Sequence, residues 1–253
     1  MKATEIQAIY VMWLRQMKRF IRSKSRLVSS IVQPLFFLFI LGSGFRVAIF
    51  EGVGDYLSFL APGIIAMAIL FSSMFTGISV LWDKQFGFLQ EVLVAPISRI
   101  SIIIGRTLGG ATVALIQGCI ILLISLALGV QISGAIGLIF TLLFMVLIAF
   151  TAVGFGLVIA SKMEDFQGFQ LIMSLVVMPL LFLSSAFFPV TSNPTMKSIA
   201  MFNPLFYMVD GLRGSLIIGV ETVNSPLFNL IIVIFICIFM MSIGSYLFSK
   251  MES

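Results

Sequence analysis

Residues 107–161 read TLGGATVALIQGCIILLISLALGVQISGAIGLIFTLLFMVLIAFTAVGFGLVIAS and contain no Asp, Glu, Lys or Arg. A membrane-spanning helix needs about 20 apolar residues, and this stretch is more than twice that long. Turn-forming residues lie near its middle: Gly129, Gln131, Ser133 and Gly134. The stretch therefore predicts two membrane-spanning helices joined by a tight turn.

The whole chain has the composition of an all-α membrane protein. Of its 253 residues 60% are hydrophobic and only 10% are charged, whereas a soluble domain has about 25% charged residues. A soluble enzyme is excluded. Four more uncharged stretches bring the expected helices to six within a single transmembrane domain, residues 1–253. The expected spans are 27–45, 56–82, 107–129, 135–161, 166–188 and 225–249.

Basic residues indicate the orientation of these spans. An even number of spans places both termini on one side, and the segments on that side hold twelve Lys and Arg residues. The other side holds three: Arg46, Lys197 and Arg213. The positive-inside rule therefore predicts that both termini are cytoplasmic. The N-terminal segment lacks the short basic region and small-residue cleavage site of a signal peptide, so we expect it to be retained.

Several classes of function are excluded by what the chain lacks. It has no His, which excludes Ser-His-Asp triads and His-ligated zinc. Cys119 and Cys237 lie inside long apolar runs, so neither a disulfide framework nor a metal site is expected. The basic residues cluster beside the first span, which is a membrane-surface pattern and not a nucleic-acid groove.

Residues 1–26 have the pattern of an amphipathic helix lying in the membrane interface. Apolar residues recur at helical spacing: Ile6, Ile9, Tyr10, Trp13, Met17, Phe20 and Ile21. Arg15, Lys18, Arg19 and Arg22 lie largely on the other side, where they suit anionic lipid. The helix is either a simple topology anchor or an elbow that braces the first span.

The loop at 83–99, DKQFGFLQEVLVAPISR, predicts a short cytoplasmic helix. Phe86, Leu89 and Leu93 share one helical face, Glu91 projects elsewhere, and Pro96 ends the helix. Such a helix either lies flat on the membrane or inserts into a groove on a partner protein.

Residues 189–219 are expected on the outer side as broken helices. Pro189, Asn193, Pro194, Asn203 and Pro204 prevent a continuous span, and short helices are expected at 198–202 and 205–216. Asp210 and Arg213, three residues apart, form either a weak surface pair or a pair that stabilises a gate.

Three motifs in order give the chain a resemblance to a known family. They are Leu89-x-Glu91-x-Leu93-Val-Ala-Pro96-Ile-Ser-Arg99, then Ser185-Ala-Phe-Phe-Pro189, then Asn203-Pro204-Leu-Phe-Tyr207 with Val209-Asp210-Gly-Leu-Arg213. With the basic N-terminal helix and six spans, the chain resembles ABC-2 type permeases of the daunorubicin-resistance kind over essentially its whole length. These permeases are the membrane subunits of ATP-binding-cassette exporters.

The resemblance implies that the 83–99 loop is a coupling helix docked on an ATPase subunit. The residues implied at that contact are Phe86, Leu89, Glu91, Leu93, Pro96 and Arg99. It also implies a partly re-entrant hairpin closing the outer end of the pathway, with these gate candidates: Phe187, Phe188, Pro189, Asn203, Pro204, Tyr207, Asp210 and Arg213. The assembly implied has two ATPase subunits and two permeases, either two copies of this chain or this chain with a similar one.

Energy must come from a partner chain. No Lys follows a Gly anywhere, so the phosphate-binding P-loop is absent, and ATP and Mg are expected on the ATPase subunit. We expect no enzymatic activity and no cofactor in this chain. Ser72, Thr76, Ser79 and Gln170 are polar groups within the spans, and they either join helices or line a route. Gly110, Ala114 and Gly118 predict a close helix contact.

The leading hypothesis is export of a hydrophobic drug, lipid or lipid-linked substrate across the plasma membrane of a prokaryote. Export of a polysaccharide or glycolipid by the same family is the alternative. A glycan route is typically lined by aromatic side chains, and the chain has only two Trp and four Tyr, so this alternative is less favoured. A channel or ion-coupled carrier is disfavoured because no charged residue falls within an expected span core. An intramembrane enzyme lacks an assignable nucleophile and base.

Overall fold

The computed structural model of the chain describes residues 3–44, 55–88, 92, 94, 97–190, 193–217, 219–220 and 222–251. Within these residues the structure is helical, with one isolated antiparallel bridge between Ile132 and Ile217. The longer helices are α1 (Ala3–Arg22), α2 (Lys24–Gly44), α3 (Tyr56–Gln85), α5 (Arg99–Ala127), α6 (Gly134–Lys162) and α11 (Pro226–Ser249). The shorter elements are α7 (Phe166–Ile172), a π-helical turn η1 (Met173–Val177), α8 (Met178–Phe182), α9 (Pro194–Met201) and α10 (Pro204–Leu216).

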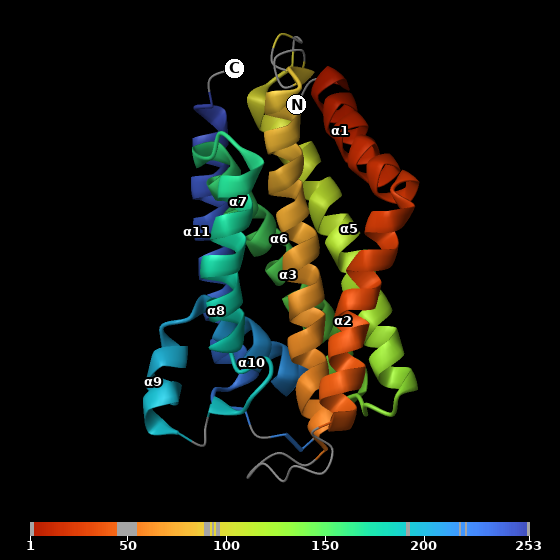
Figure 1. Cartoon of the computed structure of the whole chain (residues 1–253), viewed down its shortest axis with the longest axis vertical. Helices are drawn as coiled ribbons and strands as arrows, with labels where there is room; N and C mark the ends of the chain where they lie inside the picture. Colours follow the sequence, from red (N-terminus) through yellow and green to blue (C-terminus); the bar gives the residue numbers. More distant parts are fainter. Residues whose placement is uncertain are drawn as a thin grey trace.

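Helices α2, α3, α5, α6 and α11 run side by side along one axis, α1 lies obliquely to them, and both chain ends lie at the same end of the bundle (Figure 1). We call this the terminal end. Helices α9 and α10 lie at the opposite, distal end (Figure 1). Five helices of the described residues are long and apolar enough to cross a membrane: α2, α3, α5, α6 and α11.

The span expected at 166–188 differs from the prediction. It is a shorter apolar helix, Phe166–Phe182, interrupted by η1. Pro179 lies two residues after this turn, and a proline ring clashes with the carbonyl four residues earlier, which here belongs to the turn. A π-turn, with its wider hydrogen-bond spacing, accommodates that clash without ending the helix. A continuous helix through residue 188 is therefore wrong, and the count of six spans stays a prediction.

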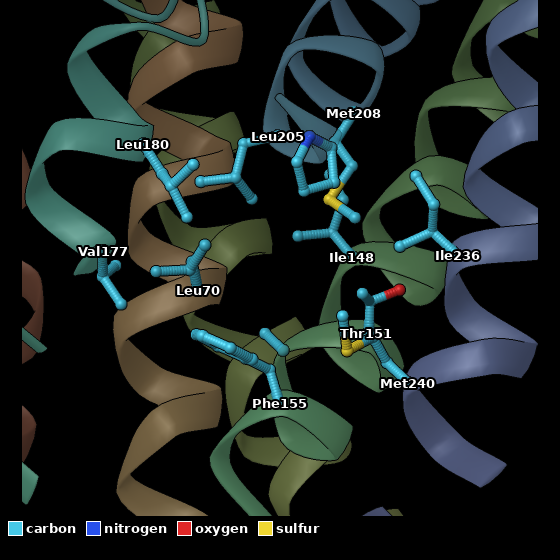
Figure 2. Close-up of a pocket in the computed structure, with 12 residues that line it drawn as sticks. Leu70, Ile148, Thr151, Phe155, Val177, Leu180, Leu205, Met208, Ile236 and Met240 are labelled. Carbon is cyan, nitrogen blue, oxygen red and sulfur yellow. The ribbon is translucent and has the colours of Figure 1, made fainter. Parts of the chain in front are cut away.

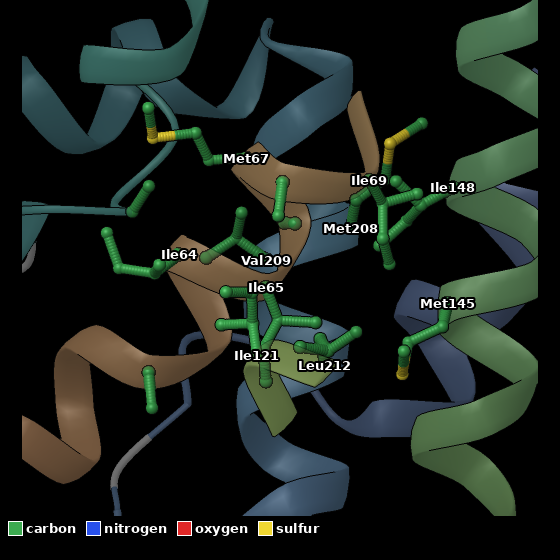
Figure 3. Close-up of a cluster of buried hydrophobic side chains, with 14 of the residues drawn as sticks. Ile64, Ile65, Met67, Ile69, Ile121, Met145, Ile148, Met208, Val209 and Leu212 are labelled. Carbon is green, nitrogen blue, oxygen red and sulfur yellow. The ribbon is translucent and has the colours of Figure 1, made fainter. Parts of the chain in front are cut away.

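Helix α3 is the centre of the bundle. In its most apolar 18-residue segment, 83% of the residues are buried. The corresponding shares for α2 and α11 are 17% and 22%. Figure 3 shows Ile64, Ile65 and Ile69 of α3 packed among residues of three other helices: Ile121 of α5, Met145 and Ile148 of α6, and Met208, Val209 and Leu212 of α10. A helix that is apolar on all sides lies either in a protein core or in lipid, and the burial of α3 places it among its neighbouring helices.

Small residues set the closest helix contacts. A Cβ at Gly110 would collide with Thr76 of α3, and one at Gly118 would collide with Ile69 of α3. The contact predicted from Gly110, Ala114 and Gly118 is thus confirmed as an α3–α5 interface. Gly77 of α3 and Gly156 of α6 form a second close approach, in which backbone meets backbone.

Helix α1 lies against α5 and ends at a break at Ser23. Gly105 and Gly109 of α5 allow its backbone to approach closely, and the indole Nε1 of Trp13 donates to Thr112 Oγ1 at 3.2 Å. The residues expected on one apolar face of α1 differ in exposure. Phe20 is buried, as are Met12 and Gln16, whereas three residues of the expected face are exposed: Ile6, Tyr10 and Ile21. The helix braces α5 more extensively than the first span.

Candidate functional site

The loop after α3 lies at the terminal end and presents apolar side chains to the surroundings. Phe86 is 82% exposed and Val94 is 86% exposed. Four of the predicted coupling residues lie outside the described residues: Leu89, Glu91, Leu93 and Pro96. Arg99, the first residue of α5, is exposed, and its guanidinium donates to the carbonyl of Ser249 at the end of α11. Phe86 is therefore available to a partner, whereas Arg99 also holds α5 to α11.

A buried carboxylate directly before this loop joins three helices. The Asp83 Oδ1 lies 2.6 Å from Arg15 Nη2 of α1, and its Oδ2 lies 2.6 Å from Arg106 Nη2 of α5. Arg19 Nη1 is 3.8 Å from the same carboxylate. We call Asp83, Arg15, Arg19 and Arg106 the Asp83 cluster. The Asp83 cluster connects the end of α3, and hence the start of the loop, to α1 and α5.

Arg106 is the most deeply buried member of the Asp83 cluster, with no exposed surface. Its Nε and Nη1 have no hydrogen-bond partner in the described part of the chain. Sequence reasoning placed Asp83 and Arg106 in the aqueous segment between two spans, because one uncharged stretch ends just before Asp83 and the next begins just after Arg106. The helices α3 and α5 in fact continue past both residues and bury them.

Aromatic rings connect the Asp83 cluster to the loop. The guanidinium of Arg15 lies 3.8 Å from the ring centre of Phe88, and that of Arg19 lies 4.8 Å from Trp82. Trp82 in turn stacks on Phe166 at the start of α7, 5.6 Å between ring centres. Burial lowers the pKa of Arg19, an effect that attraction to Asp83 opposes. A force on the loop would thus reach α1, α5 and α7 through direct contacts.

At the distal end, Arg213 of α10 holds the turn that follows α8. Its Nη2 donates to the carbonyl of Ser185 at 2.6 Å, and its Nε donates to the carbonyl of Phe59 at 3.3 Å. The guanidinium also lies 3.8 Å from the ring centre of Phe59. Ser185 has φ of 62°, a conformation that non-glycine residues rarely adopt. Arg213 therefore fastens an unfavourable turn to α3 and α10.

Asp210 holds a different segment. Its Oδ1 accepts from the backbone N–H of Val223 at 3.1 Å, and its Oδ2 accepts from Asn224 N–H at 3.0 Å and Asn229 Nδ2 at 2.9 Å. Asp210 and Arg213 are both buried, so a weak surface pair is wrong. Instead, Arg213 secures the chain before α9 and Asp210 secures the chain before α11.

The other gate candidates gather at the same end. The Asn203 Nδ2 donates to the carbonyl of Leu180 at 2.5 Å, while its Oδ1 caps α10 at Leu205 N–H. Tyr207 Oη donates to the carbonyl of Met201 at 2.8 Å. Phe187 is buried, Phe188 is exposed, Pro189 follows them, and Pro204 is the first residue of α10. The structure brings these residues together, and their role as a gate stays a prediction.

The four polar candidates within the spans do not form one site. Ser79 Oγ accepts from Gln16 Nε2 of α1 at 3.2 Å, and Thr76 packs on Gly110 of α5. Ser72 is buried on the same helix, whereas Gln170 is exposed on α7. For Ser79 and Thr76 the contacts agree with the helix-joining interpretation.

An apolar cavity of about 60 Å³ lies midway along the bundle, between α3, α6, η1, α8, α10 and α11 (Figure 2). Its walls are Leu70, Ile148, Thr151, Ala152, Phe155, Val177, Leu180, Pro204, Leu205, Met208, Ile236 and Met240. The Thr151 hydroxyl donates to the carbonyl of Leu147 at 2.7 Å, so it is already satisfied. A cavity of this kind stays dry and takes apolar groups.

Comparison with known proteins agrees with this architecture. The family model described as ABC-2 type transporter matches residues 7–217. The chain is 30% identical over 213 residues to ycf38 of Cyanophora paradoxa, named as a transport permease, with 82% of this chain and 73% of that protein covered. It is 27% identical over 212 residues to the inner membrane transport permease YadH of Escherichia coli K12, covering 81% of each. It is 30% identical over 159 residues to YbhR of the same strain, named as a multidrug ABC transporter permease, covering 62% of this chain and 43% of that one.

Proposed function

Because the chain belongs to the ABC-2 type transporter family, we propose that it is the membrane-spanning subunit of an ATP-driven exporter whose ATPase subunit docks on the 83–99 loop. One observation supports this position of the docking site. Phe86 and Val94 are exposed, and the end of α3 that leads into this loop lies at the terminal end of the bundle, where both chain ends also lie (Figure 1). Exposed apolar side chains on a short loop are the anchors that a groove on a partner buries.

The cytoplasmic placement of that end rests on charge. Twelve of the 15 Lys and Arg residues belong to the segments predicted to be cytoplasmic, and positive residues are retained on the cytoplasmic side. Of these segments, the end of α3 and the end of α11 lie at the terminal end (Figure 1). In this arrangement α7, η1 and α8 together make the sixth crossing, and α9 and α10 are the partly re-entrant outer gate. The membrane is the plasma membrane of a prokaryote.

The working assembly contains two ATPase subunits and two copies of this chain, with the substrate route at their two-fold interface. ATP binding would draw the two loops together, and the Asp83 cluster would pass that motion to α1 and α5. The substrate is a hydrophobic drug, lipid or lipid-linked molecule. The apolar walls of the cavity beside η1 support this class, and the relative YbhR is named as a multidrug permease.

The test is purification of the tagged chain from its native membrane in mild detergent, followed by assays for a co-purifying subunit and for ATP hydrolysis. We expect a P-loop ATPase at about one copy per chain and hydrolysis stimulated by substrate. If the chain elutes alone and moves solute in vesicles without ATP, a channel or carrier replaces this proposal.

Two matched variants localise the docking contact. Phe86→Ala should lower ATPase recovery at least about fivefold, because a buried aromatic anchor contributes more than 1 kcal/mol. Phe202→Ala removes an equally exposed ring, 92% exposed, at the distal end and should leave recovery unchanged. Glu91→Lys, which reverses a charge within the loop, should uncouple hydrolysis from transport. Wild-type recovery in Phe86→Ala would place the ATPase elsewhere.

A further inference from the structure

A groove of about 690 Å³ runs along α1 at the terminal end and is strongly cationic. Its walls are Val11, Leu14, Arg15, Lys18, Arg19, Arg22 and Ser23. Four of these seven residues carry a positive charge, and no acidic residue is among them. Lys18 and Arg22 are exposed and have no ion pair within 4 Å in the described part of the chain.

Asp83 forms ion pairs with two cations of the groove, Arg15 and Arg19, and its one negative charge does not balance their positive charge. Within the residues that the structure describes, Asp83 is the one carboxylate that forms ion pairs with the three guanidinium groups of Arg15, Arg19 and Arg106, all within 4 Å. One negative charge balances one of the three, which leaves two positive charges in addition to Lys18 and Arg22. Like charges held this close repel one another, and the repulsion weakens when an anion binds among them.

The surroundings of the groove determine which kind of anion fits. Val11 and Leu14 form an apolar part of its own wall. Helix α2 begins directly after Ser23 and exposes Val28, Val32 and Phe36, which share one helical face because they are four residues apart. Tyr10 and Trp13 stack near the start of the groove, 5.9 Å between ring centres, and such aromatics favour the headgroup region of a bilayer.

We propose that this groove binds the headgroup phosphate of an anionic phospholipid of the surrounding bilayer, with Lys18 and Arg22 as its principal ligands and Arg15 and Arg19 beside them. The acyl chains of that lipid run along the exposed face of α2. The bound phosphate supplies the negative charge that the Asp83 cluster lacks, and it holds α1 against α5. The proposal requires a membrane-embedded chain and does not depend on ATPase docking or on the exported substrate.

The test uses the two tryptophans of the chain, Trp13 and Trp82, both close to the groove. The full chain is reconstituted in phosphatidylcholine vesicles that contain brominated phosphatidylglycerol or, separately, the same fraction of brominated phosphatidylcholine. Bromine quenches nearby indoles, so excess quenching by phosphatidylglycerol reports its enrichment. We expect strong excess quenching in the wild-type chain.

Lys18→Gln with Arg22→Gln should reduce the preference for phosphatidylglycerol at least about tenfold, because two cations near the membrane surface are lost. The matched control, Lys162→Gln with Lys250→Gln, removes the same charge from the same end outside the groove and should keep the preference. If Lys18→Gln with Arg22→Gln does not fold, Arg22→Gln alone, at the exposed end of α1, gives a smaller loss in the same direction.

Three results would overturn the proposal. Equal loss in both double variants would mean that overall charge, and not the groove, attracts the lipid. Displacement of phosphatidylglycerol by millimolar inorganic phosphate would indicate a site for a soluble anion. A groove variant that keeps its lipid preference but loses the co-purifying ATPase would assign the groove to a protein partner.

Discussion

Arg106 Nη2 lies 2.6 Å from Asp83 Oδ2, and this contact joins the terminal ends of α3 and α5 where the predicted coupling loop connects them. Both side chains are buried. Arg15 and Arg19 keep about 30% of their side-chain surface exposed and can reach water, whereas Arg106 cannot. The pair therefore links the stability of the bundle to the position of the loop.

Asp83→Asn should destabilise the protein by about 3 kcal/mol, because it leaves the buried charge of Arg106 without a counter-ion. Thermal unfolding of the detergent-solubilised chain measures this. The double variant Asp83→Leu with Arg106→Met removes both charges and should be more stable than Asp83→Asn alone. A double variant less stable than the single one would mean that the pair is not coupled in this way.

Arg213→Met should destabilise the distal end by about 2 kcal/mol or more, because the carbonyls of Ser185 and Phe59 lose a buried donor. Arg213→Lys should not restore stability, since an ammonium group cannot donate to both carbonyls as the planar guanidinium does. Proteolysis of the 183–193 segment would be faster in both variants. Resistance equal to that of the wild-type chain would show that the turn holds without Arg213.

Ser185→Gly should recover part of the stability lost in Arg213→Met. Ser185 has φ of 62°, and glycine adopts this conformation at about 1 kcal/mol less than other residues. The double variant should therefore unfold at a higher temperature than Arg213→Met alone. An unchanged unfolding temperature would mean that the conformation of residue 185 contributes nothing to the loss.

Gly77→Ala should destabilise the bundle by about 1–3 kcal/mol, the usual cost of overpacking. A Cβ at Gly77 would meet the backbone carbonyl of Gly156, so α3 and α6 would have to separate. The matched control is Gly44→Ala at the end of α2, where a Cβ meets no described residue within 4 Å. Thermal unfolding should distinguish the two substitutions, and equal effects would contradict a tight α3–α6 contact.

Ala152→Val should stabilise the protein by about 1 kcal/mol by filling the apolar cavity beside η1. If that cavity receives part of an apolar substrate, the same variant should transport it more slowly. Unfolding temperature and vesicle transport are the two measurements. Faster transport with lower stability would contradict this view of the cavity.

The apolar pattern predicts much of this fold. The stretches at 56–82 and 135–161 correspond to α3 and α6, and Gly129 and Gly134 do form the turn between α5 and α6, both with positive φ. The expected helix at 205–216 matches α10 to within one residue. These predictions succeed because each rests on residues adjacent in the chain.

The remaining features depend on contacts between distant residues. The spacing of Asp210 and Arg213 suggests a local pair, yet Arg213 binds Ser185 and Asp210 binds Asn229. The ends of α3 and α5 extend into charged residues because Asp83 and Arg106 neutralise each other. Neither arrangement follows from helical periodicity, because periodicity within one helix does not show which residues of different helices are in contact.

Helix α3 has a further consequence for how the chain is made. Ser72, Ser73, Thr76 and Ser79 are buried against neighbours, and α5 and α6 follow α3 in the chain. During synthesis α3 therefore reaches the bilayer before α5 and α6, and the face of α3 that packs against them is uncovered until they arrive. A chain whose synthesis stopped after α3 had left the ribosome but before α5 was inserted would be an unfinished product with this helix uncovered, which quality-control proteases of the membrane can recognise.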